Sequence, residues 1–210
     1  AASDVYKRQA YEYLMRHFAT ESGKSKGQFY TPGEVSRVMA SIIGIHDAET
    51  SANTTVYDPT CGSGSLLLRI GTAANTSVTL YGQEKDSATS GLARMNMILH
   101  DVHYQKFDLR QADTLEDPQH EGQVFEAIVA NPPFSAKWSA DPLKLNDPRY
   151  SIYGKLAPKT KADYAFVTHM IHHLDDNGTM AVVVPHGVLF RGAAEGHIRE
   201  FLLKDRNWLD

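Results

Sequence analysis

The segment from Val56 to Leu68 has the pattern of a strand, a glycine loop and a helix in succession. An apolar approach leads to Asp58, a loop of small residues includes Gly62 and Gly64, and an apolar helix start follows. Glycines let the backbone approach a ligand closely, and the free N–H groups of a helix start favour an anionic group. The order predicts a nucleotide site in an α/β fold. Because the spacing differs from the triphosphate-binding loop and no lysine follows Gly64, a ligand with less phosphate is preferred.

Acidic residues end the next two predicted strands. Glu84 closes the strand that begins at Val78, about 20 residues beyond the glycine loop, the separation at which a carboxylate commonly binds ribose hydroxyls. A solvated strand-end side chain is the alternative for Glu84 alone. Asp113 follows a strand of roughly residues 107–112 and is placed to accept from an adenine amine. Ligands of open α/β sheets lie outside the carboxyl ends of the strands, so Asp58, Glu84 and Asp113 are expected in one crevice.

A rigid tip, Asn131-Pro132-Pro133-Phe134, follows a further buried-strand pattern over residues 125–130. Asn131 offers a side-chain carbonyl acceptor, the prolines remove two N–H donors while leaving their carbonyls free, and Phe134 supplies a flat face. The tip is suited to hold a planar amine such as that of a flipped-out base. A strand end broken by Pro-Pro is the structural alternative.

Taken together, these motifs resemble S-adenosylmethionine-dependent N6-adenine DNA methyltransferases, and more narrowly the modification subunit of type I restriction-modification systems. The resemblance implies a doubly wound, mostly parallel sheet of the Rossmann-like methyltransferase type. A further motif of the resemblance is the segment Gln-Phe-Tyr-Thr-Pro at residues 28–32. The resemblance implies that this segment closes over the methionine part of S-adenosylmethionine, opposite the glycine loop. The expected cofactor contacts are Gln28, Phe29, Tyr30, Thr31, Pro32, Asp58, Gly62, Ser63, Gly64, Ser65, Glu84 and Asp113.

The same resemblance implies an activity and a set of partners. A methyl group would pass from S-adenosylmethionine to N6 of an adenine extruded from double-stranded DNA, with Asn131, Pro132, Pro133 and Phe134 as the catalytic residues. Asn131 and the Pro132 carbonyl would accept the two amine hydrogens. The expected partners are a specificity subunit, a restriction subunit and a second modification subunit, in the cytoplasm.

Two other functions stay open at this stage. N-methyltransferases acting on a protein glutamine or an RNA guanine amine share the Asn-Pro-Pro-aromatic tip, although the position of Gln28–Pro32 before the glycine loop favours the adenine DNA class. The second is an inactive fragment that binds DNA or a partner. Calorimetry with S-adenosylmethionine separates such a fragment from the enzymes.

Charge is unevenly distributed along the chain. The net charge is −4, whereas contacts to DNA phosphates usually require an excess of lysine and arginine. A basic stretch with interleaved aromatic residues leaves the predicted base pocket between Lys137 and Lys161. A solvated loop is one interpretation of this stretch, and contact with the target strand is the other. On the second interpretation, the DNA-binding residues are Lys137, Trp138, Arg149 and Lys155.

Cysteine and histidine usage excludes several kinds of site. The single cysteine, Cys61, leaves no internal disulfide and is compatible with a reducing compartment. Its place in the glycine loop invites a nucleophile interpretation, but small residues are needed there and direct methyl transfer requires no covalent intermediate. The ten histidines include no clean set of metal ligands, so no metal site is expected. No apolar run approaches the ~20 residues of a membrane span.

Helical periodicity predicts helices over residues 87–100, 163–174 and 195–204. Met95, Ile98 and Leu99 are assigned to the core side of the first helix, and His169 and His173 lie off the main apolar stripe of the second. A turn at Asp175–Gly178 is expected to precede a strand over residues 178–185.

Two segments are expected in the domain organisation. Residues 1–26 would be the remnant of a helical region or an artefact of sequence assembly, and residues 27–210 a methyltransferase domain that stops before its last two strands, near a sixth strand starting at Asn207. The 210-residue chain alone is therefore expected to methylate DNA poorly.

Overall fold

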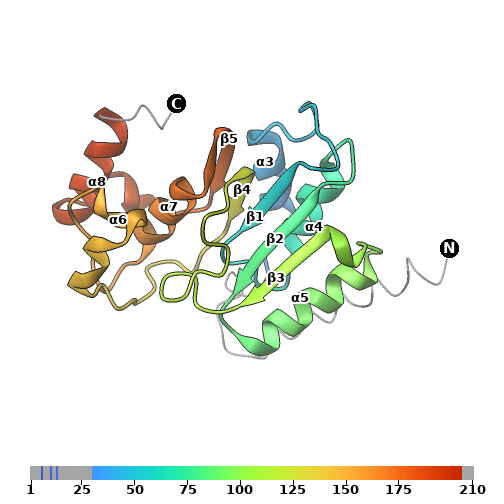
Figure 1. Cartoon of the computed structure of the whole chain (residues 1–210), viewed down its shortest axis with the longest axis horizontal. Helices are drawn as coiled ribbons and strands as arrows, with labels where there is room; N and C mark the ends of the chain where they lie inside the picture. Colours follow the sequence, from blue (N-terminus) through green and yellow to red (C-terminus); the bar gives the residue numbers. More distant parts are fainter. Residues whose placement is uncertain (1–5, 7–9, 11–12, 14–29, 205–210) are drawn as a thin grey trace.

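The computed structural model describes residues 6, 10, 13 and 30–204, and a parallel sheet forms its centre (Figure 1). The sheet has five strands in the order β3-β2-β1-β4-β5. Every neighbouring pair is parallel, which confirms the predicted doubly wound α/β class. The strands are β1 (Thr55–Asp58), β2 (Thr79–Glu84), β3 (Phe107–Gln111), β4 (Phe125–Ala130) and β5 (Leu174–Val182).

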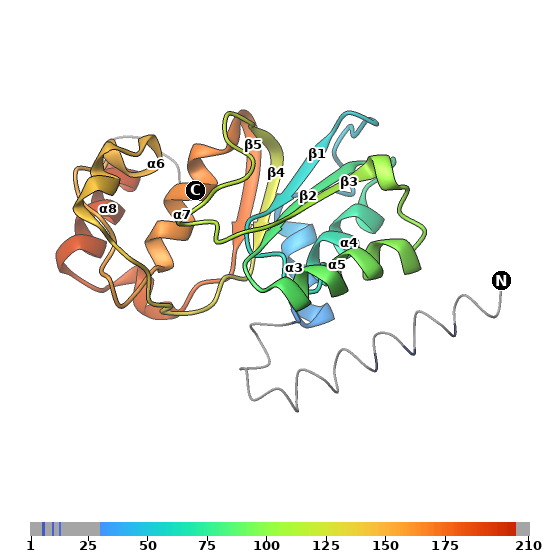
Figure 2. The ribbon, with the colours of Figure 1, turned by 60° about the horizontal axis from the view of Figure 1, so that its bottom comes forward.

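Helices cover both faces of the sheet (Figure 2). One face carries α3 (Gly33–Ile42), α4 (Ser65–Ala73) and α5 (Ser87–Leu99), and the other carries α7 (Asp163–His172). The short α6 (Pro148–Ser151) and the longer α8 (Ala193–Lys204) extend the α7 side. Short 3-10 turns are η1 (Tyr104–Lys106), η2 (Pro142–Asn146) and η3 (His186–Leu189).

Alternation along the strands explains this layering. Successive side chains of a strand point to opposite faces, so Val56 packs with Leu80 beneath α3 to α5, while Tyr57 packs with Phe125 and Met170 on the α7 side. All five of these side chains are buried. Strands of parallel sheets are covered on both faces, which is why their sequence is apolar with little alternation.

The strand order reverses beside β1, which pairs with β2 on one side and β4 on the other. The chain therefore leaves β1 and β4 toward opposite faces of the sheet and opens a crevice between their carboxyl ends. Ligands of doubly wound folds bind at such a reversal. The glycine loop follows β1 and the Asn131 tip follows β4, so both border the crevice.

The predicted core face of α5 is wrong for Met95 and Ile98, whereas Leu99 is half-buried. Met95 and Ile98 are exposed, at 49% and 67%, whereas Ala93, Asn96 and Met97 are buried. α5 packs closely behind the glycine loop, where a Cβ atom added at Gly64 would lie 3.0 Å from Met97 Cε. Close approach favours small side chains, so the buried stripe of this helix includes Thr89, Ser90 and Ala93.

Helix α7 also differs from its prediction, because its residues Asp163 to Ile171 are all buried. His169 and His173 therefore lie in the interior, at 0% and 2% exposure. The sheet covers one side of the helix, and a second core, which includes Tyr150, Tyr164 and Leu202, covers the other. A helix that is buried on all sides has no polar face, so the sequence does not show which of its residues face the sheet.

Strand β5 begins earlier than predicted, at Leu174 instead of Gly178. While β4 advances from Phe125 to Ala127, β5 advances from Leu174 to Thr179, so the expected turn is an irregularity inside the strand. The predicted strand near Asn207 lies outside the described residues. In the described part of the chain, no helix combines the length and apolar character needed to cross a membrane.

Candidate active site

The glycine loop connects Asp58 at the end of β1 to Ser65 at the start of α4. Gly62 and Gly64 adopt φ angles of 53° and 75°, the left-handed region that disfavours residues with a Cβ atom. The loop is tied to the neighbouring strand by a hydrogen bond from the Cys61 amide to the Gln83 carbonyl, at 3.0 Å. Its N–H groups therefore stand at a fixed place above the sheet edge.

Glu84 lies at the end of β2 and faces this loop. Its Oε2 atom accepts a hydrogen bond from the Gly62 amide at 3.1 Å, and its Oε1 atom accepts one from the Asp86 amide at 2.8 Å. The predicted ribose-binding acid and the glycine loop are thus joined directly. Glu84 is half-buried, so its carboxylate is also presented to the cavity described below.

Asp58 is 1% exposed and turns back into the loop. Its Oδ1 atom accepts hydrogen bonds from the Thr60 amide at 2.9 Å and the Thr60 hydroxyl at 3.4 Å. Burial raises the pKa of Asp58 to about 7; the Thr60 bonds oppose this rise, and the charge of Glu84 adds to it. In this structure Asp58 holds the turn after β1, and its predicted contact with a cofactor stays a prediction.

Asp113 lies just beyond β3 and is bridged to Lys85, whose Nζ atom is 2.7 Å from Asp113 Oδ2. The hydrogen bond from Lys85 and its charge interaction with Asp113 raise the pKa of the lysine. Asp113 Oδ1 also accepts from the Leu115 amide at 3.0 Å. The predicted adenine acceptor is therefore at the sheet edge, and Lys85 is a partner that the sequence analysis missed.

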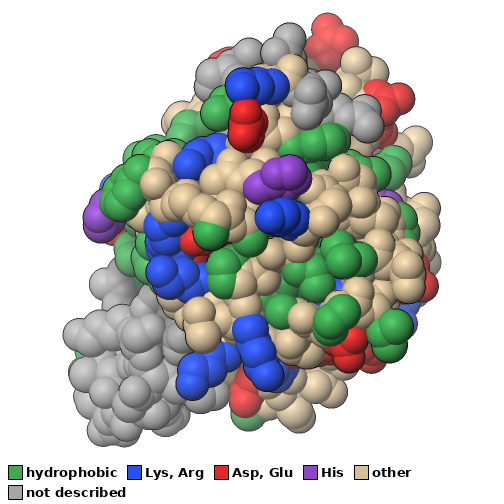
Figure 3. All heavy atoms as spheres, turned by 90° about the vertical axis from the view of Figure 1, so that its left-hand side faces the viewer, with side chains coloured by type: hydrophobic (Ala, Val, Ile, Leu, Met, Phe, Trp, Pro, Cys, Tyr) green, Lys and Arg blue, Asp and Glu red, His purple; other side chains and the backbone are tan. Residues whose placement is uncertain are grey.

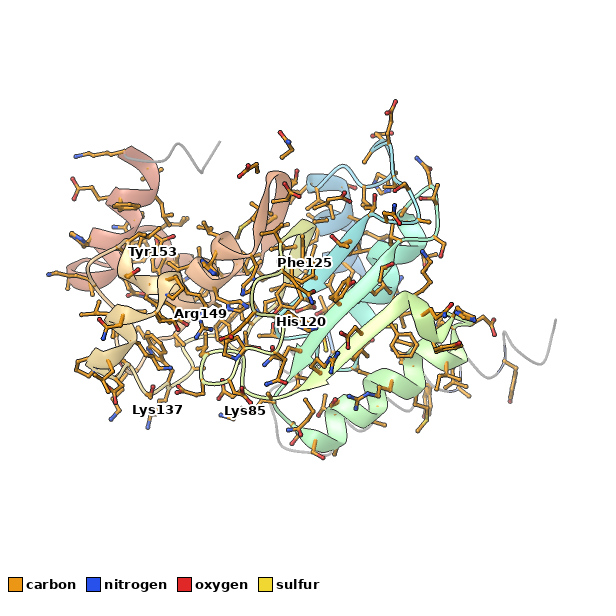
Figure 4. All side chains as sticks on the ribbon, viewed as in Figure 1. Lys85, His120, Phe125, Lys137, Arg149 and Tyr153 are labelled. Atoms are coloured by element: carbon orange, nitrogen blue, oxygen red, sulfur yellow. The ribbon has the colours of Figure 1, made fainter. Side chains whose placement is uncertain are left out.

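A cavity of about 560 Å³ lies at the carboxyl edge of the sheet and brings the predicted residues together. Glu84 and Asp113 line it with Asn131 and Pro133. Lys85 and Lys137 also line this cavity, and both extend beyond the carboxyl ends of the strands (Figure 4). The remaining lining residues are Pro59, Thr60, Asp86, Ser87, Thr89, Gln111, Thr114, Leu115, Ala136, Trp138 and Phe166.

The tip after β4 completes this edge. Asn131 is half-buried, and its Nδ2 atom lies 3.5 Å from the Thr31 hydroxyl, where it donates a long hydrogen bond. The tip after β4 thus contacts the Gln-Phe-Tyr-Thr-Pro segment, although Asn131 and Thr31 are 100 residues apart in the sequence. Phe134 is 51% exposed and offers its ring to solvent. Gln28 and Phe29 lie outside the described residues; Tyr30 lines a separate cavity between α3 and α4.

Ser63 and Ser65 share a hydrogen bond of 2.9 Å between their hydroxyls at the start of α4. Asn96 of α5 supports this turn, because its Nδ2 atom donates to the Ser63 carbonyl at 2.9 Å. The sequence analysis missed Asn96 because a polar residue in a helix is ordinarily read as exposed. Burial raises the pKa of the Cys61 thiol well above its ordinary value, and the charges of Asp58 and Glu84 add to the rise, which disfavours a nucleophilic thiolate.

The structure does not support Trp138 and Arg149 as surface contacts to DNA, because they are only 6% and 5% exposed. Trp138 donates from Nε1 to the Pro158 carbonyl at 3.1 Å and packs on Tyr150. The aromatic residues of the basic stretch fill the second core on the α7 side instead of facing solvent. Lys137 and Lys155 are exposed, so the predicted role in DNA binding stays open for these two.

Arg149 organises a buried polar network that the sequence analysis missed. Its Nη1 atom donates to the Thr114 carbonyl at 2.8 Å and lies 3.2 Å from His169 Nδ1. Because arginine can only donate, His169 Nδ1 accepts, and the proton on Nε2 is donated to the Tyr57 hydroxyl at 3.1 Å. Burial lowers the pKa of His169 far below its ordinary value, with the charges of His173 and Arg149 adding to the effect. The network fixes Thr114, which lines the cavity.

Within the described residues, no group of three or more His, Cys, Asp and Glu side chains is placed to hold a metal ion. The buried histidines His120, His169 and His173 instead pack against Tyr57, with ring centroids 5.3 to 6.0 Å away. Figure 4 shows His120 beside Phe125 in this interior cluster. These three histidines are therefore part of the core.

Comparisons with known proteins identify the family. The type I restriction enzyme MpnII methylase subunit of Mycoplasma pneumoniae is 41% identical over 216 residues, which cover 96% of this chain and 39% of that subunit. The MjaIX methylase subunit of Methanocaldococcus jannaschii is 31% identical and is covered to 36% of its length. The chain thus spans well under half of these relatives.

Solved structures show the same fold. The type I restriction-modification methyltransferase subunit from Streptococcus thermophilus superposes with a TM-score of 0.84 and 48% identity, covering 94% of this chain and 42% of that one. A class I S-adenosylmethionine-dependent methyltransferase from Listeria monocytogenes shares the fold with a TM-score of 0.75 at 16% identity, over 96% of this chain and 59% of that one. The family model described as N-6 DNA Methylase matches residues 3–208. The chain belongs to the N-6 DNA methylase family.

Proposed function

We propose that the protein containing this chain transfers a methyl group from S-adenosylmethionine to N6 of adenine in DNA, as the methylase subunit of a type I restriction-modification system. One observation carries the proposal. A single cavity at the reversal of strand order is lined by the acids that suit a nucleoside, Glu84 and Asp113, and by the tip that suits a planar amine, Asn131 and Pro133. Family membership supplies the reaction class.

The residues of this edge fit S-adenosylmethionine part by part. Glu84 presents a carboxylate to ribose hydroxyls, and Asp113 presents one to an adenine amine, which would take the position held here by Lys85 Nζ. Gly62 and Gly64 leave the backbone bare next to the start of α4, where N–H groups suit the methionine carboxylate. The cavity volume of about 560 Å³ is within the usual range for small-molecule sites.

The chemistry asked of the protein is mainly positioning. An adenine amine is a poor nucleophile because its lone pair is delocalised into the ring. The Asn131 side-chain carbonyl and the Pro132 backbone carbonyl would accept its two hydrogens and favour a more pyramidal nitrogen. Phe134 would hold the ring from one face. When bound, the cofactor would supply the methyl group from its sulfonium, and the amine nitrogen that accepts it would lose its surplus proton to water.

DNA and protein partners follow from the same proposal. The net charge of −4 and the burial of Arg149 leave little basic surface for sequence-independent binding of a duplex. On the α6 and α8 side, basic and hydrophobic side chains are interspersed without forming one continuous basic patch (Figure 3). We therefore assign sequence reading to a separate specificity subunit, and propose a second methylase subunit and a restriction subunit in the complex.

Nucleoside analysis tests the proposed substrate. The full-length subunit, assembled with its specificity subunit, is incubated with labelled S-adenosylmethionine and DNA, RNA or protein, and the products are identified by mass spectrometry. N6-methyladenine in DNA alone is the expected result. Methylated guanine in RNA or methylated glutamine in protein would show that the enzyme acts on another class of amine. Cofactor binding without any methylated product would show that the chain only binds and does not catalyse.

A further inference from the structure

Two exposed apolar side chains follow β5 on a backbone that is held rigidly. Leu189 and Phe190 are 70% and 67% exposed. Just before them, the Val188 carbonyl accepts hydrogen bonds from the Tyr164 hydroxyl at 3.1 Å and from Arg199 Nη1 at 2.8 Å. Burial of Val188 and exposure of Phe190 on one short turn mean that the fold presents this ring outward. Single exposed apolar residues are common, whereas adjacent ones that form a contiguous apolar surface point to an interaction site.

The same segment lies beside the catalytic tip. Ala130 pairs with Val182 in the sheet, and the Val183 amide donates to the Ala130 carbonyl at 3.0 Å, so the chains leaving β4 and β5 start from neighbouring positions. The ring of Phe134 belongs to the first chain and the ring of Phe190 to the second.

One buried carboxylate then ties the two chains together. Asp163, 2% exposed, accepts from the Ser135 amide at 2.7 Å and from Arg191 Nη1 at 2.9 Å. Ser135 directly follows Phe134, and Arg191 directly follows Phe190. Arg191 also binds Glu195 at 2.9 Å, and it passes so close to Gly187 that a Cβ atom there would lie 2.5 Å from Arg191 Nε. The two chain segments that carry the exposed rings are therefore tied to the same carboxylate.

We propose that Phe190, with Leu189 beside it, inserts into the DNA base stack next to the adenine that is extruded toward Phe134. The inference rests on the proposed methylation of DNA. Extrusion of a base breaks its stacking on the neighbouring bases, and an apolar side chain that fills the opened step offsets that loss. A ring that is exposed in the described part of the chain, on a segment tied through Asp163 to the tip after β4, meets both requirements.

Single-turnover methylation by the full-length subunit with its specificity subunit tests this role. Two duplexes are compared: a matched site, and the same site with an abasic position opposite the target adenine, which lowers the cost of extrusion. Phe190→Ala should slow methylation of the matched duplex by about tenfold or more, because each 1.4 kcal/mol of lost stabilisation is a factor of ten. On the abasic duplex the defect should shrink to within about threefold, and Phe190→Trp should retain most of the rate on both.

Matched variants separate this role from others. Tyr104→Ala removes another exposed aromatic ring that neighbours a histidine, before β3 at the opposite edge of the sheet, and should leave both rates unchanged. Phe134→Ala should slow both duplexes, since its ring acts on the base after extrusion. The proposal is overturned if Phe190→Ala is as active as wild type, is equally slow on both duplexes, or fails to assemble with the specificity subunit. If the wild-type complex methylates neither duplex, the proposed function itself fails.

Discussion

Glu84 Oε2 accepts a hydrogen bond from the Gly62 amide at 3.1 Å, so the acid that ends β2 and the glycine loop that follows β1 form one unit. A ligand that binds Glu84 is then also held next to the loop. Glu84 therefore holds the loop, and we propose that it also binds the cofactor.

Replacement of Glu84 by alanine should weaken the binding of S-adenosylmethionine by roughly 1.5–3 kcal/mol, because hydrogen bonds to charged groups contribute about this much. Isothermal titration calorimetry on the full-length subunit measures the change. Glu126→Ala is the control, since Glu126 is an exposed acid on β4 that lies at the amino-terminal side of the sheet and outside the cavity. An unchanged dissociation constant for Glu84→Ala would remove this residue from the site.

Substitution at Gly64 should affect both folding and binding. Its φ of 75° places an added Cβ atom in a strained conformation, 3.0 Å from Met97 Cε, so Gly64→Ala should destabilise the protein by about 1–2 kcal/mol. Gly91→Ala is the matched control, because Gly91 lies in helix α5 with open space around it and alanine should stabilise the helix by up to about 1 kcal/mol. Urea unfolding measures the free energy of unfolding of both variants. Equal effects of the two substitutions on this free energy would contradict the strain at Gly64.

Loss of Arg149 should destabilise the fold, in contrast to a surface lysine of the same basic stretch. Arg149→Met leaves the Thr114 carbonyl and His169 Nδ1 buried without their donor, and each unsatisfied group costs about 1–3 kcal/mol. Lys155→Met changes an exposed side chain and should stay within about 0.5 kcal/mol of wild type. Similar free energies of unfolding for the two variants would return Arg149 to the surface role that its sequence context suggested.

The stability of the protein should depend on the protonation of Asp58. Burial raises the folded-state pKa of Asp58 to about 7, against about 3.9 for an unfolded aspartate. The folded chain then binds more protons than the unfolded chain between these values, so this group's contribution to stability falls as the pH rises from about 4 to about 7. Asp58→Asn removes the titration. The free energy of unfolding of wild type relative to this variant should therefore decline between pH 4 and pH 8; a constant or rising difference would exclude the raised pKa.

The strand edges could be predicted because several signals coincide there. An apolar run, a chain-breaking loop and a polar tip mark the ends of β1, β2, β3 and β4, and parallel strands bring such ends to one edge. Asp113 illustrates the limit of this reasoning. Its position followed from the strand, but its bridge to Lys85 depends on side chains that meet only in the folded chain.

The parts that could not be predicted depend on packing between distant segments. Hydropathy assigned Met95 and Ile98 to the core, yet α5 approaches the glycine loop through Ala93 and Asn96. Ala93 is small enough to allow close packing, and Asn96 donates a hydrogen bond to the Ser63 carbonyl of the loop. Trp138 lies in a basic, aromatic stretch of the kind that contacts nucleic acids, but its ring is buried in the second core on the α7 side. Neither the hydropathy pattern of α5 nor the basic stretch around Trp138 shows which distant segment will pack against these side chains.

The most direct test of the account separates cofactor binding from methyl transfer at Asn131. In the full-length subunit with its specificity subunit, Asn131→Ala should bind S-adenosylmethionine within about threefold of wild type, because in the proposed mechanism this side chain accepts from the target amine and not from the cofactor. Formation of N6-methyladenine should fall by about 100-fold or more, as is typical when a donor or acceptor to the reacting group is removed. Asn53→Ala, at an exposed position before β1, should leave both quantities unchanged. Methylation by Asn131→Ala at the wild-type rate would contradict the proposed mechanism.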